Sequence, residues 1–376
     1  MDGCSSYRFG AGRFFQGRNL LSESGKEILR YGKKAYVIGG ATAFSLTKDI
    51  MVESFQKAGL DSVWEEYCGY PSHLKIDELI EMVHEKECDV LVGVGGGRIM
   101  DLAKAAAAAT HLPVVTIPTS AATCAAFSPL SVIYTTEGRS DDYINFEEEV
   151  NAVLVDEDIM LTQPPRLLAA GILDAMAKYV EIATHMEDRG NEFDKVSDDT
   201  DISLHSAFYF AKYTYDVLKQ NGMQAVADLR EGKWTKTFHD VVFLNIALTG
   251  VVSAIMRGRG QTALGHAFNN AARTLFLNEA TPYLHGETVA VGLIAQLIYN
   301  EDPNEIAPLY HFMRELAVPC TLQEIGIEGT EKNVEMLETR IRRHPFVKKD
   351  EEHYERLHRA LTYIAGGKYD FENNAG

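Results

Sequence analysis

Apolar and polar positions alternate in two distinct ways along this chain, and the change falls near residue 158. Before it, short apolar runs rich in β-branched residues predict strands at 34–40, 62–67, 89–94, 113–118, 131–134 and 152–155. Stretches with helical periodicity separate them, ending near residue 58 and covering 76–86 and 98–110. Strands that are continuous apolar runs between helices indicate a parallel sheet covered on both faces. We predict an α/β domain over residues 1–157.

Beyond residue 158 the strand patterns nearly vanish. Helical periodicity predicts helices at 164–186, 202–220, 237–256 and 288–299. Pro164 and Pro165 mark a break in the chain between the two patterns. We therefore predict a second, all-helical domain over residues 158–376, with an exposed acidic loop at 186–201.

Composition narrows the classes of partner. A length of 376 residues exceeds what a single core usually supports, which agrees with two domains. The formal net charge is -18, so the chain has no electrostatic reason to bind nucleic acid or an anionic membrane surface. We expect a small-molecule substrate, and any anion must be held by local donors. The oligomeric state stays open, a homo-oligomer included.

The cysteines and the N-terminus indicate a cytoplasmic protein. The five cysteines are scattered without a CxxC pair, which argues against a disulfide framework and a cysteine-rich zinc site. The first residues, MDGCSSYRFGAGRFF, lack the charged-then-apolar pattern of a signal peptide. No apolar run reaches the roughly 18 residues of a membrane span.

Two loops after predicted strands are suited to a ligand. Gly95, Gly96 and Gly97 connect a strand to a helix, where free backbone N–H groups and the helix dipole favour a pyrophosphate. The segment is neither a P-loop nor a GxGxxG fingerprint, and a tight turn without a ligand is the alternative. The second loop, residues 118–131, is rich in small and hydroxyl residues. Its Thr119 and Ser128 can donate to phosphate or ribose, or simply serve the turn.

A carboxylate and two histidines are candidate metal ligands. Asp174, Lys178 and Glu181 share one face of a predicted helix, and Asp174 lies among apolar neighbours, so it needs a partner. A salt bridge to Lys178, one helical turn away, would supply Asp174 with such a partner. His266 lies on another helix, and His285 lies at a helix start, which keeps an imidazole neutral. One Asp and two His is the ligand count of a catalytic zinc site, although buried core histidines remain the alternative.

Five motifs in one order carry a resemblance. They are GGG-x₃-D-x₂-K from Gly95 to Lys104, then SPLSVIYT, D-A-x-A-K-x₂-E, GHAF and HGE-x-VA-x-G. Together they resemble the iron-containing/glycerol dehydrogenase family, which has the dehydroquinate-synthase-like fold. The resemblance implies a Rossmann-like domain that binds a nicotinamide cofactor, an all-helical metal-binding catalytic domain, and an active-site cleft between the two.

The resemblance also implies roles for individual residues. Asp174, His266 and His285 match the metal ligands and are the expected catalytic residues. The expected cofactor-binding residues are Gly95, Gly96, Gly97, Asp101, Thr119, Ser128, Leu130 and Tyr134. The implied cofactors are NAD or NADP and one divalent metal ion. Zinc suits this ligand set, as do iron, nickel and manganese.

Three positions depart from the family pattern. Arg98 follows the glycines where Lys is frequent, which keeps the charge and changes the donor geometry. Cys124 stands where glycerol dehydrogenases have an Asp that contacts the polyol, so we expect Cys124 to be a substrate contact or a buried filler. Gly40 replaces the Asp that NAD-preferring members place near the adenosine ribose. Without that carboxylate, NADP is compatible with the site.

The expected activity is hydride transfer between NAD(P)(H) and a small hydroxy or oxo compound. The segment AATCAAFSPLSVIY is similar to the hydroxycarboxylate dehydrogenase branch, which implies a 2-hydroxycarboxylate/2-oxoacid substrate. The alternative is glycerol or another polyol. A dehydroquinate-synthase-like lyase needs a more basic pocket than Lys178, Arg257 and Arg259 offer. An inactive NAD-binding protein would have no need of Asp174.

Overall fold

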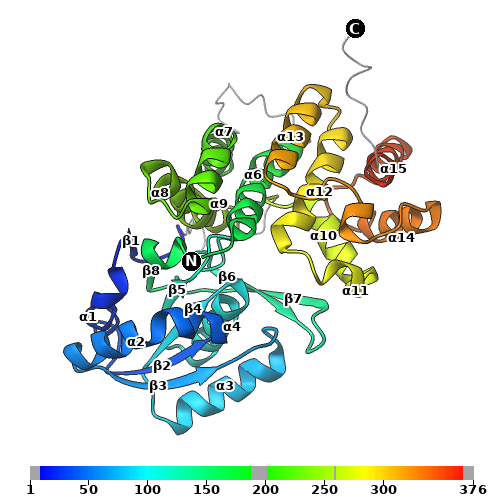
Figure 1. Cartoon of the computed structure of the whole chain (residues 1–376). Coiled ribbons are helices and arrows are strands. Elements are labelled where there is room, and N and C mark those ends of the chain that lie inside the picture. The colour runs from blue at the N-terminus through cyan, green and yellow to red at the C-terminus, as the bar shows by residue number, and fades with distance from the viewer. Residues whose placement is uncertain (1–8, 188–200, 258–259, 367–376) are drawn as a thin grey trace. The chain divides into compact units, whose positions relative to one another are not determined.

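The structure is a computed structural model that describes residues 9–187, 201–257 and 260–366 (Figure 1). The chain divides into two compact units. The first contains Met1–Leu168 and Ala227–Arg257, and the second contains Ala169–Val226 and Gly258–Gly376. This division differs from the single predicted boundary at residue 157, because the chain returns to the first unit at Ala227. Most of the predicted loop at 186–201, as well as Arg259, lies outside the described residues.

The first unit is built on a six-stranded sheet in the order β1-β8-β5-β4-β2-β3. All neighbours are parallel, as predicted. The strands are β1 (Phe14–Gly17), β2 (Lys34–Gly39), β3 (Asp61–Glu66), β4 (Val90–Gly95), β5 (Val114–Pro118) and β8 (Ala152–Asp156). After β2 the chain builds β3 on one side and then β4 on the other. Ligands bind at such a switch point, outside the carboxyl ends of the strands.

Helices cover both faces of this sheet. One face packs Val37 and Val92 against Phe44 and Phe55 of α2 (Ala41–Ala58), with α1 (Ser24–Ile28) and the 3₁₀ turn η1 (Leu20–Glu23) beside it. The other face carries α3 (His73–Glu85) and α4 (Gly97–Thr110). Both faces of the sheet are therefore buried, which explains why the central strands are apolar at successive positions.

A separate antiparallel hairpin joins β6 (Leu130–Tyr134) to β7 (Ser140–Asn145). The strand predicted at 131–134 is therefore present, but it lies outside the parallel sheet. Lys104 of α4 donates to the carbonyl oxygens of Ser128 and Leu130, and the hydroxyl of Ser131 donates to the carbonyl of Asp101. These bonds attach the start of the hairpin to α4.

The returning segment of the first unit is a bent helical run. It comprises α8 (Lys236–Phe243), the π-turn η2 (Leu244–Leu248) and α9 (Thr249–Met256). A hydrogen bond between His239 and Glu157 connects it to the short α5 (Glu157–Met160). The buried carboxylate of Glu157 accepts hydrogen bonds from Gln16, Trp234 and His239. Lys236–Met256 is long and apolar enough to cross a membrane, yet 72% of its most apolar window is buried inside the protein, as in a core helix of a soluble protein.

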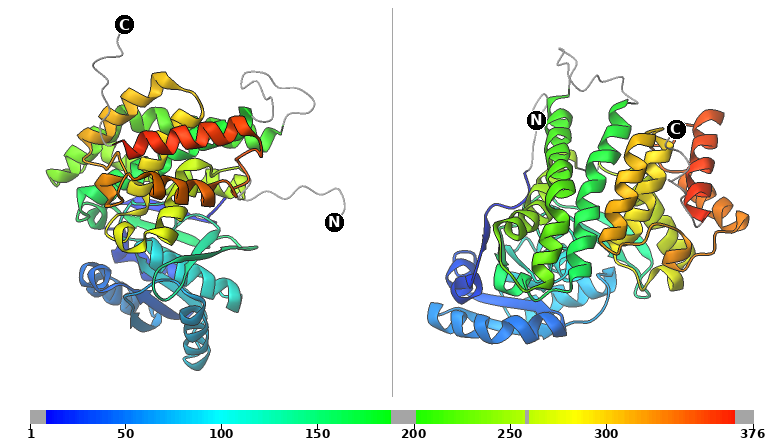
Figure 2. Two further views of the ribbon diagram at one scale, coloured as in Figure 1. Left: turned by 90° about the vertical axis from the view of Figure 1, so that its right-hand side faces the viewer. Right: turned by 45° about the horizontal axis from the view of Figure 1, so that its top comes forward.

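The second unit is helical, as predicted. Its helices are most of α6 (Pro165–Glu187) and α7 (Ile202–Arg230), with α10 (Leu264–Leu275), α11 (Leu277–Ala280), α12 (His285–Tyr299), α13 (Pro303–Glu315), α14 (Glu331–Ile341) and α15 (Glu351–Ala365), and the 3₁₀ turn η3 (Gln323–Ile325). The central helix is α12, which is buried along nearly its whole length and packs against α10, α13 and α15 (Figure 2). This packing fixes the start of α12, where His285 lies.

Candidate metal centre and nucleotide-binding loops

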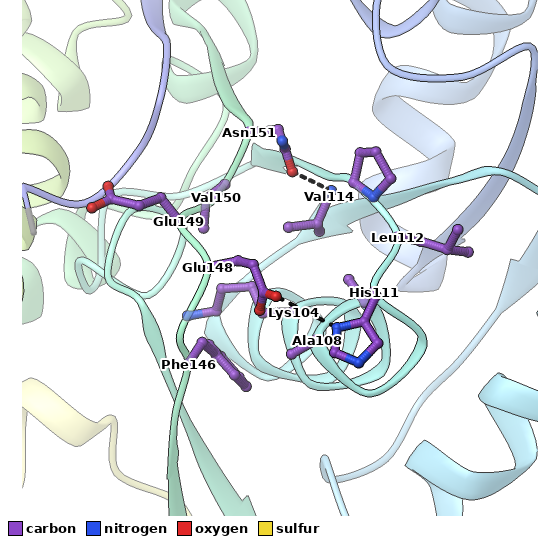
Figure 3. A pocket seen from close by; sticks show the side chains of 12 residues that line it. Lys104, Ala108, His111, Leu112, Val114, Phe146, Glu148, Glu149, Val150 and Asn151 are labelled. Carbon is purple, nitrogen blue, oxygen red and sulfur yellow. Dashed lines mark hydrogen bonds and ion pairs between the residues drawn. The ribbon is translucent and has the colours of Figure 1, made fainter. Parts of the chain in front are cut away.

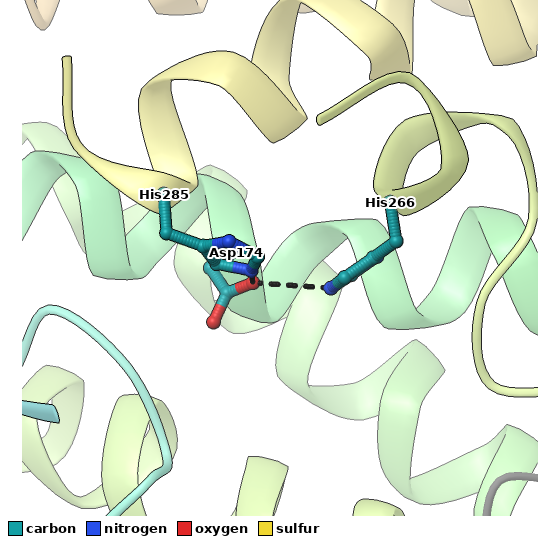
Figure 4. Close-up of side chains that lie close together, drawn as sticks. All are labelled: Asp174, His266 and His285. Carbon is teal, nitrogen blue, oxygen red and sulfur yellow. Dashed lines mark ion pairs between the residues drawn. The ribbon is translucent and has the colours of Figure 1, made fainter. Parts of the chain in front are cut away.

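Asp174, His266 and His285 converge in the second unit, each from a different helix (Figure 4). One donor atom from each residue lies within 4.8 Å of the other two. Among the residues that the structure describes, this is the one group of three or more Asp, Glu, His or Cys side chains with that spacing. The three candidate ligands predicted from the sequence are therefore brought together.

Their geometry fits a bound metal ion better than it fits direct pairing. The Nε2 atoms of His266 and His285 each lie 3.4 Å from Oδ1 of Asp174, too long for a good hydrogen bond. Oδ1 is buried and has no hydrogen-bond partner. Ligand atoms at about 2.0–2.2 Å from a tetrahedral zinc ion would lie about 3.3–3.6 Å apart. Both distances to Oδ1 of Asp174 fall within that interval.

Glu181 orients His266. Its carboxylate, fully buried, lies 2.5 Å from Nδ1 of His266 and also accepts the backbone N–H groups of Ala263 and His266. Burial alone would raise the pKa of Glu181, but the neighbouring His266 outweighs it and lowers that pKa. Nδ1 therefore carries the proton that Glu181 accepts, and the lone pair of Nε2 is left for another partner.

The start of α12 positions His285. His285 is the first residue of the helix, and desolvation lowers the pKa of its imidazole, which favours the neutral form that can bind a metal ion. Gly286 follows it, and a Cβ there would lie 2.0 Å from the carbonyl oxygen of Ala170. The absence of a side chain thus lets α12 approach the backbone of α6, one turn before Asp174.

Asp174 is held in its ionised form without a salt bridge to Lys178. Burial would raise the pKa of Asp174, but the imidazoles of His266 and His285 outweigh it and hold the pKa well below its ordinary value. The ammonium of Lys178 lies 3.3 Å from Nε2 of His266 instead, and in the described part of the chain no carboxylate lies within 4.0 Å of it. The alternative of an Asp174–Lys178 ion pair is not what the structure contains.

The glycine-rich loop of the first unit lies at the switch point of its sheet. Gly39, the last residue of β2, pairs with Val94 of β4, so the glycines after both strands are neighbours. Gly95 has φ of 148°, which disfavours other residues, whereas a Cβ at Gly96 would meet no atom within 4 Å. Gly96 is the exposed N-cap of α4. Its lack of a side chain therefore leaves room for a ligand at the helix N-terminus.

Buried groups hold the second loop in place. The N–H of Thr119 donates to the carbonyl of Gly95, and Thr116 donates to the carbonyl of Ala126. The side chain of Gln163 accepts a hydrogen bond from the N–H of Ala121, and the side chain of Asn245 donates to the carbonyl oxygen of Ala121. These contacts fix the loop without using its half-exposed hydroxyl groups.

Two residues of the predicted cofactor set, Asp101 of α4 and Ser128 of this loop, face the protein interior. Asp101 is buried beside Lys104, and burial raises its pKa to about 6 despite that ammonium. Ser128 is also buried, and Leu130 begins the hairpin. Cys124 is buried, and its thiol is 3.8 Å from the hydroxyl of Ser253 on α9.

Tyr134 contacts the aromatic ring of Tyr70, which in turn contacts Arg98 in the first turn of α4. Its ring is 5.5 Å from that of Tyr70, and the guanidinium of Arg98 lies 4.2 Å above the Tyr70 ring. Arg98 is exposed. The stacked guanidinium is therefore an available cation next to Gly97, at the end of α4 that favours anions.

A cavity of about 150 Å³ lies at the opposite end of α4 (Figure 3). Its lining includes His111, Phe146, Glu148 and Asn151, and it borders the amino end of β5. Ligands of parallel sheets bind at the carboxyl ends, so this cavity is outside the expected nucleotide site.

Sequence reasoning missed Gln163 and Asn245, which hold the peptide group of Ala121. Asn245 is in the π-turn of the returning segment, and its side chain is almost completely buried. Its sequence context, FLNIAL, reads as an ordinary apolar helix. A polar residue on an otherwise apolar helix was the available signal, because such a residue needs a buried partner.

Comparisons with known proteins agree with this arrangement. The profile of iron-containing alcohol dehydrogenases matches residues 11–157. The glycerol dehydrogenase of Thermotoga maritima is 32% identical over 327 residues, which cover 85% of this chain and 84% of that protein. This chain belongs to the iron-containing alcohol dehydrogenase family. It is accordingly a metal-dependent oxidoreductase.

Two further relatives differ in how much of the chain they match. Hydroxycarboxylate dehydrogenase A of Escherichia coli is 33% identical over 239 residues, 64% of this chain and 63% of that protein. The crystal structure of glycerol dehydrogenase from Schizosaccharomyces pombe has 26% identity and a TM-score of 0.83, covering 96% of this chain and 91% of that chain. The family and the fold expected from the five motifs are thus confirmed, and several of the longer matches are to glycerol dehydrogenases.

Proposed function

We propose that this iron-containing alcohol dehydrogenase family member oxidises a small vicinal diol or polyol such as glycerol, and reduces the corresponding carbonyl compound. The supporting observation is the convergence of Asp174, His266 and His285, with both imidazoles 3.4 Å from the Asp174 carboxylate, in a chain with long matches to glycerol dehydrogenases. The sequence alone favoured a 2-hydroxycarboxylate, and the comparisons favour the polyol instead.

In this proposal Asp174, His266 and His285 hold a divalent ion, with zinc the expected metal. When bound, the ion would act as a Lewis acid that favours loss of the substrate hydroxyl proton to solvent, and the nicotinamide would be the acceptor for the hydride of the carbon that bears this hydroxyl. Glu181 keeps the Nδ1 proton on His266, so Nε2 faces the ion. The low pKa of Asp174 keeps its carboxylate ionised.

The first unit supplies the cofactor site in this proposal. Gly95, Gly96 and Gly97 accommodate the pyrophosphate at the N-terminus of α4, with Arg98 as a nearby cation. Beyond the glycines, Thr119, Leu130 and Tyr134 are the half-exposed members of the predicted cofactor set. Asp101 and Ser128 are buried and would act by shaping the site.

NADP is compatible with the adenosine end of this site. Gly40 follows β2, and a Cβ there would meet only the carbonyl oxygen of Tyr67, at 4.0 Å. No carboxylate at this position repels a 2′-phosphate. Gly40→Asp fits sterically and should shift the ratio of NADPH to NADH turnover towards NADH; an unchanged ratio would contradict this role for Gly40.

A 2-hydroxycarboxylate is the second candidate substrate. Cys124 replaces the acidic polyol contact of glycerol dehydrogenases, and its thiol is turned toward Ser253. The loss of a carboxylate removes repulsion toward an anionic substrate. The relative that bears a hydroxycarboxylate name has the same level of identity over a shorter match.

The deciding experiment is a substrate panel on the zinc-loaded protein. Glycerol, propane-1,2-diol, lactate and 2-oxobutyrate are compared with NAD(H) and NADP(H). We expect the highest kcat/KM with a diol and loss of turnover after treatment with a chelator. Activity that resists chelation would contradict the metal site, and turnover of the acids alone would select the second candidate. We expect the enzyme to work in the cytoplasm without a nucleic-acid or membrane partner.

A further inference from the structure

Lys178 is a buried cation at the candidate metal centre with an unusual set of partners. It follows Asp174 by one turn of α6 and is only 6% exposed. Its ammonium contacts Nε2 of His266 at 3.3 Å, and within the described residues no carboxylate lies within 4.0 Å. A buried ammonium ordinarily requires a charged or hydrogen-bonding partner for each of its N–H groups.

The one acceptor that Lys178 contacts is also needed by the metal ion. A neutral imidazole has a single ring lone pair, and the Nδ1 proton of His266 is already directed to Glu181. The lone pair of Nε2 is therefore the group that either accepts from Lys178 or binds the metal ion. When the ion is bound, the ammonium of Lys178 must find another acceptor.

The charges around the centre indicate what that acceptor is. A divalent ion and Lys178 bring three positive charges, against the two carboxylates of Asp174 and Glu181, while both histidines are neutral as ligands. The loaded centre therefore carries an excess of positive charge. Hydrogen bonds from an ammonium to an anionic oxygen are about twice as strong as neutral ones.

From this juxtaposition we infer that Lys178 is a substrate-binding residue, whose ammonium donates to a negatively charged oxygen of the substrate. The inference rests on the proposed dehydrogenase function. In a diol the reacting oxygen is neutral on binding and becomes negatively charged only when its proton leaves, before the hydride is given up, so loss of Lys178 should lower kcat. In a 2-hydroxycarboxylate the carboxylate is charged from the start, so loss of Lys178 should mainly raise KM.

The test compares Lys178→Met, which keeps the length and removes the charge, with Lys178→Arg and wild type. Lys219→Met is the matched control, because Lys219 is a partly exposed lysine of the same unit that pairs with Glu305. Oxamate, an unreactive analogue of 2-oxoacids, is titrated calorimetrically into each zinc-loaded protein. Zinc affinity is measured separately by competition with a chromophoric chelator.

For Lys178→Met we expect the oxamate Kd to rise tenfold or more, and kcat/KM for the substrate to fall by about ten- to a hundredfold. Zinc affinity should stay equal or increase, because a repelling cation has been removed. Lys178→Arg should recover part of the oxamate binding, and Lys219→Met should match the wild type.

Oxamate binding and kinetic constants within twofold of wild type would overturn the inference. So would a loss of zinc binding in Lys178→Met and in Lys178→Gln, since Lys178 would then serve to build the metal site. Lys178→Gln also replaces the methionine variant should that one fail to fold. If the wild type turns over none of the panel, the proposed function fails, and the oxamate titration still decides the role of Lys178.

Discussion

The glycine loop of the first unit and the metal centre of the second unit use different parts of the polypeptide, the backbone in one and side chains in the other. In the first unit, the glycine loop after β4 offers backbone N–H groups at the start of a helix, at a point fixed by the strand order of the sheet. In the second unit, three helices each contribute one side chain to the metal centre. The first arrangement depends on topology, whereas the second depends on how closely the helices pack.

The glycines of the two units illustrate this difference. A Cβ on Gly96 would meet nothing within 4 Å, so that glycine leaves space for a ligand. A Cβ on Gly286 would meet the backbone of Ala170, and one on Gly292 would lie 2.8 Å from the carbonyl oxygen of Gly265. At Gly286 and Gly292, the lack of a side chain lets neighbouring helices approach closely. Substitution of Gly96 should therefore affect ligand binding, whereas substitution of Gly286 or Gly292 should affect folding.

The largest effect is expected from His266→Ala. The variant removes one of three ligands and leaves the carboxylate of Glu181 buried without its imidazole. We expect zinc to be absent by elemental analysis and turnover to fall by at least about a thousandfold. His311→Ala, which changes an exposed histidine on α13, is the control. Retained zinc and activity would remove His266 from the metal centre.

Gly286→Ala tests the close packing of α12 on α6. The added methyl group would lie 2.0 Å from a backbone oxygen that cannot rotate away, so the start of α12 must shift together with His285. We expect destabilisation of about 3 kcal/mol in denaturant unfolding and weaker zinc binding. Normal stability with normal zinc affinity would show that the helices are less tightly packed than described.

Glu181→Gln tests the orientation of His266 without creating a cavity. The amide keeps the size of the side chain and removes the charge that fixes the Nδ1 proton. We expect zinc affinity to decrease by about ten- to a hundredfold, measured by chelator competition. Glu305→Gln, at a partly exposed carboxylate, should leave the affinity unchanged. An unaltered affinity in Glu181→Gln would mean that packing alone orients the imidazole.

The smallest effect on the protein, and the sharpest contrast, is expected from Gly96→Ala. Because the methyl group enters empty space, the unfolding midpoint should match the wild type. The Kd for NAD(P)H, followed by fluorescence, should rise by about tenfold because the methyl group occupies ligand space. Gly17→Ala, which also meets no atom within 4 Å, should change neither quantity. A large loss of stability in Gly96→Ala would contradict the contrast between Gly96, which leaves space for a ligand, and Gly286, which allows helices to pack.

The sequence predicts the first unit well where burial is uniform. The strands predicted at 34–40, 89–94 and 113–118 agree with β2, β4 and β5 to within one residue, because both of their faces are buried. β1 and β7 escaped prediction. Their residues are half-buried or exposed and show no apolar run, so long-range pairing decides their conformation.

The candidate site could be predicted in part. Asp174, His266 and His285 were identified because five motifs occur in one order, whereas their convergence depends on helix packing that no local pattern encodes. The role of Glu181 follows from the structure alone, although its helix face was predicted correctly. Cys124 and Asp101 matched family positions, yet their side chains face inward because of contacts with Ser253 and Lys104.

The discontinuous first unit has a practical consequence for dissecting the protein. A fragment that stops near residue 157 would lack Lys236–Met256, and so would expose the apolar surface against which that segment is buried. Such a fragment should aggregate, and the missing helix would be equally insoluble alone. A workable minimal nucleotide-binding protein joins residues 1–168 to 227–257 through a designed linker. We therefore expect the first unit, where we propose that the cofactor binds, to be obtainable by splicing the gene, and not by truncating it.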